Sequence, residues 1–304
     1  MNKGYILVFL TAIISGFAIF INKFGVSVVN PYIFTWLKNF TVSLLLTGLL
    51  WALKDLRALK NLTKKQWFLL VIIGLIGGSI PFLLFFKGLS LTTASQGAFL
   101  HKTMFIYVTF LAAIFLKEKI DKRFLFGGFL LILGNLFLLK KLPYSISQGD
   151  LLVFLATLFW AIENTISKYA LRLKALQGRI VAWGRMFFGS LFIFLFLLIS
   201  QQTPLIVGLT LKQISWVLIM AIILFGYVMT WYTGLKYIPV SQATVILLLG
   251  SPITTLLSLI FGGKVNFQEI LSGVLIIFGI IFIIGFKKVL ELIREIKKLI
   301  YVRA

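Results

Sequence analysis

The chain has 304 residues, of which 60% are hydrophobic and 12% are charged, and its mean hydropathy is +1.06. A soluble domain carries about 25% charged residues, so this chain has too little polar surface to cover itself in water, and its exterior is expected to face lipid. The net charge of +22 lies in short clusters between apolar runs, which favours a membrane protein with basic loops and argues against binding of nucleic acid.

Ten apolar runs are long enough to cross a bilayer. A hydrocarbon core needs about 20 residues of helix, and backbone groups in lipid must be satisfied within the segment, so each run is expected to be a helix. The first run lacks a small-residue cleavage site and is interpreted as a retained span, not a signal peptide. The predicted spans are 4–24, 31–53, 67–87, 94–116, 123–139, 150–171, 180–200, 214–235, 241–262 and 268–286.

Lysine and arginine predict the orientation of these spans. Most of them fall between spans 2 and 3, 4 and 5, and 6 and 7, and in the segment after span 10, whereas Lys140, Lys141, Lys212 and Lys264 lie on the opposite side. The positive-inside rule therefore places both termini in the cytoplasm. The expected fold class is an all-α integral protein of the cell membrane with ten transmembrane helices.

The two halves of the chain resemble one another at an offset of 145–147 residues. The segment WLKNF at 36–40 matches WGRMF at 183–187, and Ser95-Gln96 matches Ser241-Gln242. Each half holds five spans, and an odd number means that the second half enters the membrane from the other side. The prediction is two inverted five-helix repeats, 1–143 and 144–287, an arrangement typical of secondary transporters with a site at the repeat interface.

A basic amphipathic tail, 288–304, follows the second repeat. Its apolar residues have helical spacing and its cations occupy the other face. Two interpretations remain open: a helix lying on the anionic inner membrane surface, or a solvated cytoplasmic helix.

Few ionisable side chains occur at membrane depth, where they are costly and usually face a cavity or a partner. Glu163 is the only acid deep within a span, and a carboxylate balanced between burial and a nearby cation can take up and release protons. Glu163 is therefore the candidate for proton coupling. The alternative is a fixed ion pair with Lys102 that only holds spans 4 and 6 together.

The candidate substrate-binding residues surround this carboxylate. Lys38 and Arg185 occupy equivalent repeat positions, where they could bind an anionic group or lipid phosphates. Trp160 and Asn164 share the helical face of Glu163. The full candidate set for substrate binding is Lys38, His101, Lys102, Trp160, Asn164 and Arg185.

Three further lysines, Lys23, Lys87 and Lys168, lie near span ends, and their ammonium groups are expected to snorkel to the membrane surface.

No enzyme site is predicted. The sequence has no P-loop, no paired carboxylates at membrane depth and no partner set for a nucleophilic serine. One histidine and no cysteine make a metal site improbable, and no cofactor is expected. No nucleotide-binding domain is recognised, so the energy for transport is expected to come from an ion or solute gradient.

Taken together, these features resemble the drug/metabolite transporter superfamily, and within it the EamA-type carriers. The resemblance covers essentially the whole chain and is carried by the Lys38 and Arg185 segments, by FLKEK at 115–119, and by the paired glycines Gly128/Gly134 and Gly273/Gly279. Lys264 departs from the pattern, since a glutamate equivalent to Glu118 is expected there. The resemblance implies a central cavity among spans 3, 4, 8 and 9, with spans 1, 2, 6 and 7 rocking beside them.

The function predicted from these features is alternating-access transport of a small anionic or zwitterionic metabolite such as an amino acid, linked to protons through Glu163. The partners expected are a small-molecule substrate and the lipid bilayer, with the chain a monomer or homodimer. The alternatives are a sugar-phosphate or nucleotide-sugar exchanger, a channel or lipid scramblase, and a membrane receptor or scaffold without flux.

Overall fold

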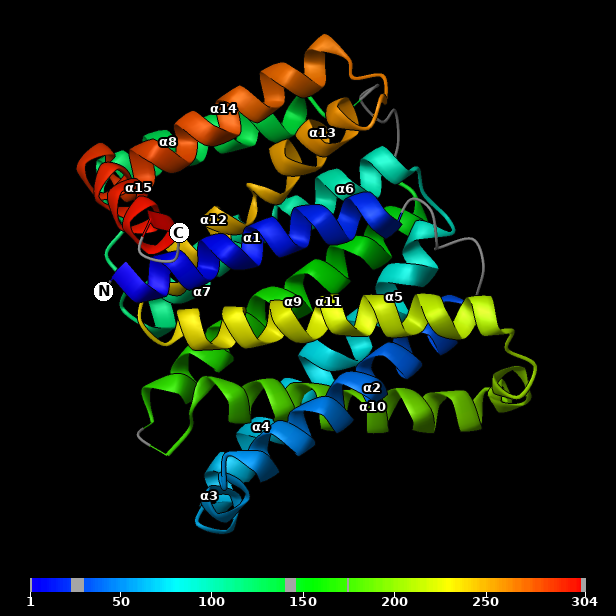
Figure 1. The fold of residues 1–304 in the computed structure, drawn as a ribbon. Helices are drawn as coiled ribbons and strands as arrows, with labels where there is room; N and C mark the ends of the chain where they lie inside the picture. Colours follow the sequence, from blue (N-terminus) through cyan, green and yellow to red (C-terminus); the bar gives the residue numbers. More distant parts are fainter. Residues whose placement is uncertain (1, 23–29, 140–145, 174, 302–304) are drawn as a thin grey trace.

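The computed structural model describes residues 2–22, 30–139, 146–173 and 175–301 (Figure 1). Within these ranges the regular elements are helices, with no strand among them. The predicted repeat boundary at 143/144 and the basic residues Lys23, Lys140, Lys141 and Arg303 lie outside the described residues.

The helices are α1 (Asn2–Asn22), α2 (Pro31–Ala52), α3 (Leu56–Lys60), α4 (Lys64–Gly78), α5 (Ile80–Leu89), α6 (Ala94–Lys102), α7 (Met104–Phe115), α8 (Lys122–Leu136), α9 (Gln148–Arg172), α10 (Gly178–Ile199), the 3-10 helix η2 (Thr203–Ile206), α11 (Leu211–Leu235), α12 (Val240–Leu247), α13 (Gly250–Ile260), α14 (Phe267–Ile284) and α15 (Phe286–Tyr301).

Nine segments of the described chain are long and apolar enough to cross a membrane, and the protein is a multi-pass membrane protein. The predicted fifth span corresponds to α8, which has 15 residues and packs along α14 (Figure 1). A helix of this length is shorter than the bilayer core usually requires. The total of ten spans therefore stays a prediction.

Local capping explains where several spans begin. Thr63, Ser147 and Thr210 each accept a hydrogen bond from the backbone N–H three residues later, and the side chain at that later position bonds back to the N–H of the capping residue. This reciprocal arrangement satisfies two N–H groups that the first helical turn leaves free. The helices α4, α9 and α11 consequently start within three residues of the predicted span starts.

Three predicted spans are each divided into two helices. Span 67–87 breaks at Ser79, between α4 and α5, and the cause is Pro81, which has no N–H for the Gly77 carbonyl four residues earlier.

The predicted spans 94–116 and 241–262 are present, and each consists of two helices. The first breaks at Thr103, whose hydroxyl bonds the Leu100 carbonyl at 2.6 Å and competes with the helical pattern. The second breaks at Leu248-Leu249, where Pro252 cannot donate to the Leu248 carbonyl, which accepts from Ser251 N at 3.1 Å instead.

The first helices of the two repeats run in opposite directions. At the end of α11, the first turn of α1 places Gly4 against Tyr237 and Ile238. The last turn of α9 reaches the same place, since Lys168 bonds the Leu235 carbonyl. The relation expected of inverted repeats is therefore present for this pair. Each of these helices packs mainly on the other half: α1 against α11 and α13, and α9 against α4, α5 and α7.

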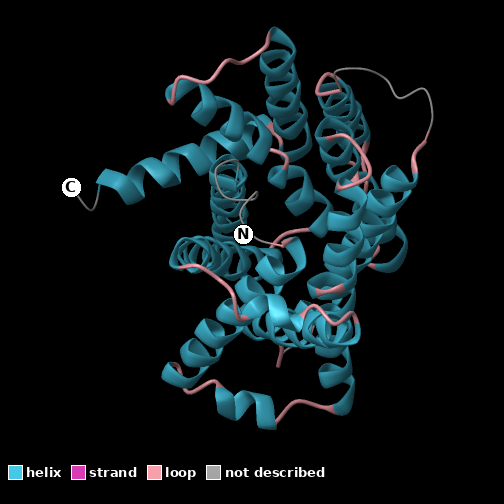
Figure 2. Ribbon diagram, turned by 90° about the vertical axis from the view of Figure 1, so that its right-hand side faces the viewer, coloured by secondary structure: helices cyan, strands magenta, loops and turns pink. Residues whose placement is uncertain are grey.

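Both chain ends lie at the same end of the bundle (Figure 1). Gly285, at φ +91°, turns the chain after α14, and α15 extends sideways from the bundle (Figure 2). Lys288 on α15 donates to the side chain of Asn2, which in turn donates to Glu295. The tail is thus a helix docked on the first turn of α1, while its contact with the membrane surface and the cytoplasmic location of both ends stay predictions.

Close contact between α4 and α10 depends on glycine, and it generates a prediction. A Cβ atom on Gly78 would lie 2.4 Å from the Arg185 carbonyl oxygen and 2.9 Å from Gly189 Cα, both of them backbone atoms that cannot rotate away. Gly78→Ala is expected to destabilise the protein by about 1–3 kcal/mol through overpacking, measured as a lower Tm in detergent. Gly48→Ala is the control, because nothing lies within 4 Å of its Cβ position and alanine favours helix. An unchanged Tm for Gly78→Ala would contradict the close contact.

Candidate functional site

A cavity of about 410 Å³ lies between the two repeats. Its walls come from α1, α2, α5, α6, α7 and α9 to α13, a wider set of helices than spans 3, 4, 8 and 9 alone. All seven residues predicted from the sequence line it: Lys38, His101, Lys102, Trp160, Glu163, Asn164 and Arg185. The structure therefore brings the predicted set together, while the role of each residue in binding or coupling stays a prediction.

The Gly77 carbonyl is the main polar anchor of the cavity wall. Because Pro81 leaves it without a helical donor, it accepts from Arg185 Nη2 at 3.0 Å and from Trp160 Nε1 at 3.1 Å. The next carbonyl, on Gly78, accepts from Asn39 Nδ2 at 3.1 Å, since Phe82 N donates to Ser79 instead. The break in span 3 thus ties α2, α9 and α10 to one point of the backbone.

Glu163 is 1% exposed and is held by two hydroxyl groups. Its Oε1 accepts from Ser167 at 2.6 Å and from Tyr232 at 2.7 Å. Gly77 permits this placement, because a Cβ atom there would lie 2.2 Å from Glu163 Cγ. No ion pair joins Glu163 to Lys102 within the described ranges, so the carboxylate is supported by neutral donors.

Tyr232 is a residue that sequence reasoning missed. It lies on α11, is 1% exposed and belongs to the same repeat as Glu163, so its hydroxyl joins α11 to α9 at the lining of the cavity. The available signal was its phenolic hydroxyl in an apolar span, because a buried tyrosine hydroxyl usually has a hydrogen-bond partner.

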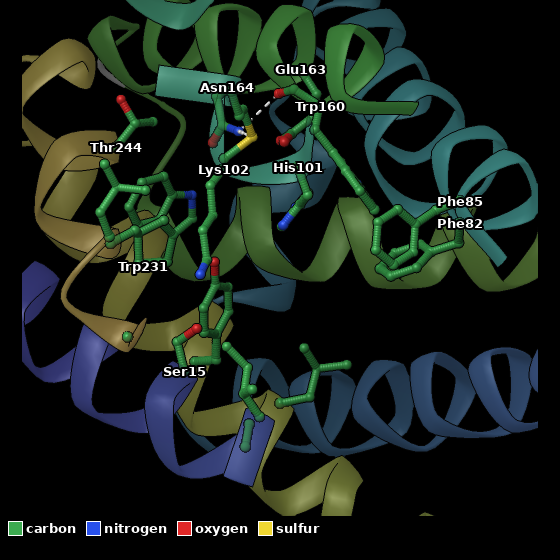
Figure 3. Close-up of a pocket in the computed structure, with 18 of the residues that line it drawn as sticks. Ser15, Phe82, Phe85, His101, Lys102, Trp160, Glu163, Asn164, Trp231 and Thr244 are labelled. Atoms are coloured by element: carbon green, nitrogen blue, oxygen red, sulfur yellow. Dashed lines mark hydrogen bonds between the residues drawn. The ribbon is translucent and has the colours of Figure 1, made fainter. Parts of the chain in front are cut away.

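One wall of the cavity is aromatic. The His101 ring centroid lies 5.0 Å from that of Trp160 and 5.4 Å from that of Phe85, and the Phe85 and Trp160 centroids are 5.3 Å apart. These side chains come from α5, α6 and α9 and face the open space (Figure 3). Such a wall offers ring faces and edges to a flat solute.

The cavity also carries more cationic side chains than acidic ones. Lys38 Nζ lies 5.9 Å and Arg185 Cζ 5.8 Å from the Phe82 ring centroid, and Lys102 extends into the same space from α6 (Figure 3). No carboxylate lies within 4.0 Å of any of these three cations in the described part of the chain.

Two buried polar atoms on this wall, Arg185 Nε and Asn164 Oδ1, have no hydrogen-bond partner among the described residues. Buried polar groups without partners are rare in folded proteins.

One charged residue outside the cavity, Lys168, differs from its predicted role. Lys168 does not snorkel: it is 7% exposed, and its ammonium donates to the carbonyls of Leu235, Lys236 and Ile238 at 2.7, 3.3 and 2.7 Å. The prediction failed because these carbonyls at the end of α11 offer the charge a partner inside the protein. Lys87, by contrast, is exposed. Glu118 accepts from Val240 N, Ser241 N and Ser241 Oγ at the start of α12.

Comparison with known proteins agrees with this architecture. A model of the EamA-like transporter family matches residues 2–140 and 147–285, one match for each repeat. The riboflavin transporter ImpX of Fusobacterium nucleatum is 31% identical over 166 residues, covering 49% of this chain and 52% of that protein, so the match spans about half of its length. An uncharacterized transporter of Clostridium kluyveri is 25% identical, and the alignment covers 92% of this chain and 92% of that protein.

A relative from Bacillus subtilis, the uncharacterized transporter YyaM, is 24% identical over 73% of this chain and 74% of its own. A solved crystal structure aligns with a TM-score of 0.71 at 15% identity, over 92% of this chain and 95% of the other, which shows a shared fold. The family and these named relatives are transporters, not enzymes. With both halves matched by the same family model, the chain belongs to the EamA-like transporter family.

Proposed function

We propose that the protein is a secondary carrier that moves a small anionic or zwitterionic metabolite across the membrane by alternating access. The observation that carries the proposal is the cavity between the repeats, whose described lining has the cations Lys38, Lys102 and Arg185 and one acid, Glu163. Charges at membrane depth are costly without a partner, so this surplus favours a solute that brings negative charge.

Substrate binding in this proposal uses the unpaired groups of the wall. Arg185 already donates through Nη2 to Gly77, and its Nε remains available for a carboxylate or phosphate oxygen. Asn164 Oδ1 could accept from the ammonium of a zwitterion. Lys38, Lys102 and His101 would complete the site from α2 and α6.

Glu163 is the proposed coupling residue. Among the described residues it is the only acid on the cavity wall. Tyr232 of the same repeat holds its carboxylate, and its side chain packs against Gly77 of the first repeat, so a change in its protonation affects contacts in both halves. Proton uptake by Glu163 would remove the negative charge that offsets the cavity cations and would alter the affinity for an anion. Binding and protonation are thereby linked.

A second candidate substrate class is a flat heteroaromatic solute such as riboflavin. The aromatic wall of Phe85, His101 and Trp160 favours it, and one relative is named a riboflavin transporter. Sugar phosphates or nucleotide sugars would use the same cations. A channel or scramblase would give flux without saturable counterflow.

The coupling role can be tested with Glu163→Gln, which keeps the size and the acceptor oxygen for Ser167 and Tyr232. Proteoliposomes with an imposed pH gradient would be screened with radiolabelled amino acids, sugar phosphates and riboflavin. The variant is expected to lose uphill, proton-driven accumulation and to keep solute exchange at equal pH. Normal uphill accumulation by the variant would contradict proton coupling through Glu163.

The anion-binding role predicts a loss of affinity in Arg185→Gln. Removing a hydrogen-bonding charge is expected to raise the KM for the transported anion on the order of tenfold or more. Lys212→Gln is the matched control, because Lys212 is exposed at the start of α11, away from the cavity. Equal KM values for the two variants would remove Arg185 from the site.

The flat-solute candidate predicts a role for the aromatic wall. Trp160→Leu is expected to weaken riboflavin binding about tenfold or more, since ring stacking contributes about 1–3 kcal/mol per ring. Quenching of riboflavin fluorescence in detergent measures this binding. The control is Trp51→Leu, because Trp51 lies on α2 and is 73% exposed. If neither the wild type nor the variants quench, the solute is of another class.

A further inference from the structure

The short connection between α11 and α12 is held by charged side chains from two other parts of the chain. Lys168 on α9 donates to the carbonyls of Leu235, Lys236 and Ile238. Glu118, which follows α7, accepts from Val240 N at 2.8 Å, Ser241 N at 3.1 Å and Ser241 Oγ at 2.6 Å. The two helix ends that flank the connection are therefore both held by charged side chains.

Each charge suits the helix end that it contacts. The C-terminal end of α11 presents free carbonyls with partial negative charge, and the N-terminal end of α12 presents free N–H groups with partial positive charge. Lys168 contacts the C-terminal end of α11 and Glu118 contacts the N-terminal end of α12, so both sets of contacts are charge-assisted. Tyr5 on α1 adds a further bond, from its hydroxyl to Gln242.

Among the described residues, the carboxylate half of this arrangement is not repeated at the opposite end of the cavity; the equivalent of Lys168, Lys23, lies outside the described residues. At the repeat offset of 146, the position equivalent to Glu118 is Lys264, so a cation stands where the carboxylate would be. The carboxylate of Asp150 does reach α6, but its contacts there are with the side chains of Thr92 and Gln96.

The side chains of α12 are also more buried than those of α6, its repeat equivalent at the opposite end of the cavity. On α12 the side chains of Val240, Ser241, Ala243, Thr244, Val245 and Ile246 are buried. On α6, the repeat equivalent of α12, most described side chains are partly or fully exposed. Among the described residues, α12 at the end that carries the termini is thus more deeply buried than α6 at the other end.

We propose that Glu118 and Lys168 are positioning residues that form a latch on α12, keeping the cavity closed at the end that carries the termini, so that the protein rests open toward the opposite side. This inference rests on the proposed alternating-access function. Thr244, one turn after the latched residues, lines the cavity itself, so release of α12 at Val240 and Ser241 opens a path to the solute.

The test uses the absence of cysteine from the chain, which lets a single introduced thiol report accessibility without background. Thr244→Cys places the thiol on the cavity side of α12 at a position that is 1% exposed. A membrane-impermeant maleimide is added to the side of the termini in vesicles of known orientation. Slow labelling is expected in the otherwise unaltered protein, and about tenfold faster labelling with Glu118→Gln, the effect of losing one charge-assisted hydrogen bond.

A second variant and a matched control sharpen the result. Ser241→Ala removes one latch contact without touching a charge, and it is expected to accelerate labelling in the same direction. Asp121→Ala is the control: its carboxylate lies on the same connecting segment but caps α8 through Phe124 N at 2.8 Å. Labelling at the wild-type rate is expected for this control.

The outcomes are separable from those of the transport assays because labelling needs no solute. Unchanged labelling in both Glu118→Gln and Ser241→Ala overturns the latch, as does equal acceleration by Asp121→Ala, which would indicate general loosening of that end. Faster labelling in the two latch variants alone supports it. If the latch opens in this way and no solute is ever exchanged, the carrier proposal fails and the latch stands.

Discussion

The missing N–H of Pro81 organises the centre of the molecule. It leaves the Gly77 carbonyl free inside the membrane, where an unsatisfied carbonyl is costly, and the donors that replace it are Arg185 and Trp160. A charged guanidinium and a large ring are thereby fixed at the cavity wall by a main-chain atom. Without this break, Arg185 would lack its anchor and α9 and α10 would lose a common contact.

Much of this arrangement could be predicted from the sequence, for reasons visible in particular residues. Lys38, Lys102, Glu163 and Arg185 stand out because charge is rare in apolar spans, and the rule that such charges face an interior cavity agrees with their place in its lining. The repeat offset and the odd number of spans per half predicted opposed directions, which α1 and α9 show.

What could not be predicted depends on contacts between distant segments. Tyr232 is an ordinary aromatic residue in its own helix and gains meaning only where α11 meets α9. Lys168 looked like an interfacial lysine because nothing in its span reveals the carbonyls at the end of α11. The break at Thr103 depends on a hydrogen bond from its hydroxyl to the Leu100 carbonyl, which hydropathy does not indicate.

The exchange of first helices between the halves has a consequence for assembly. Since α1 is buried against α11 and α13, and α9 against α4, α5 and α7, neither half covers its own first helix. The repeats are units of sequence and of symmetry but not of folding. Each half, made alone, would expose the surface that the first helix of the other half covers. The contacts of α1 with α11 and α13, and of α15 with the first turn of α1, can therefore form only after these later helices have been synthesised.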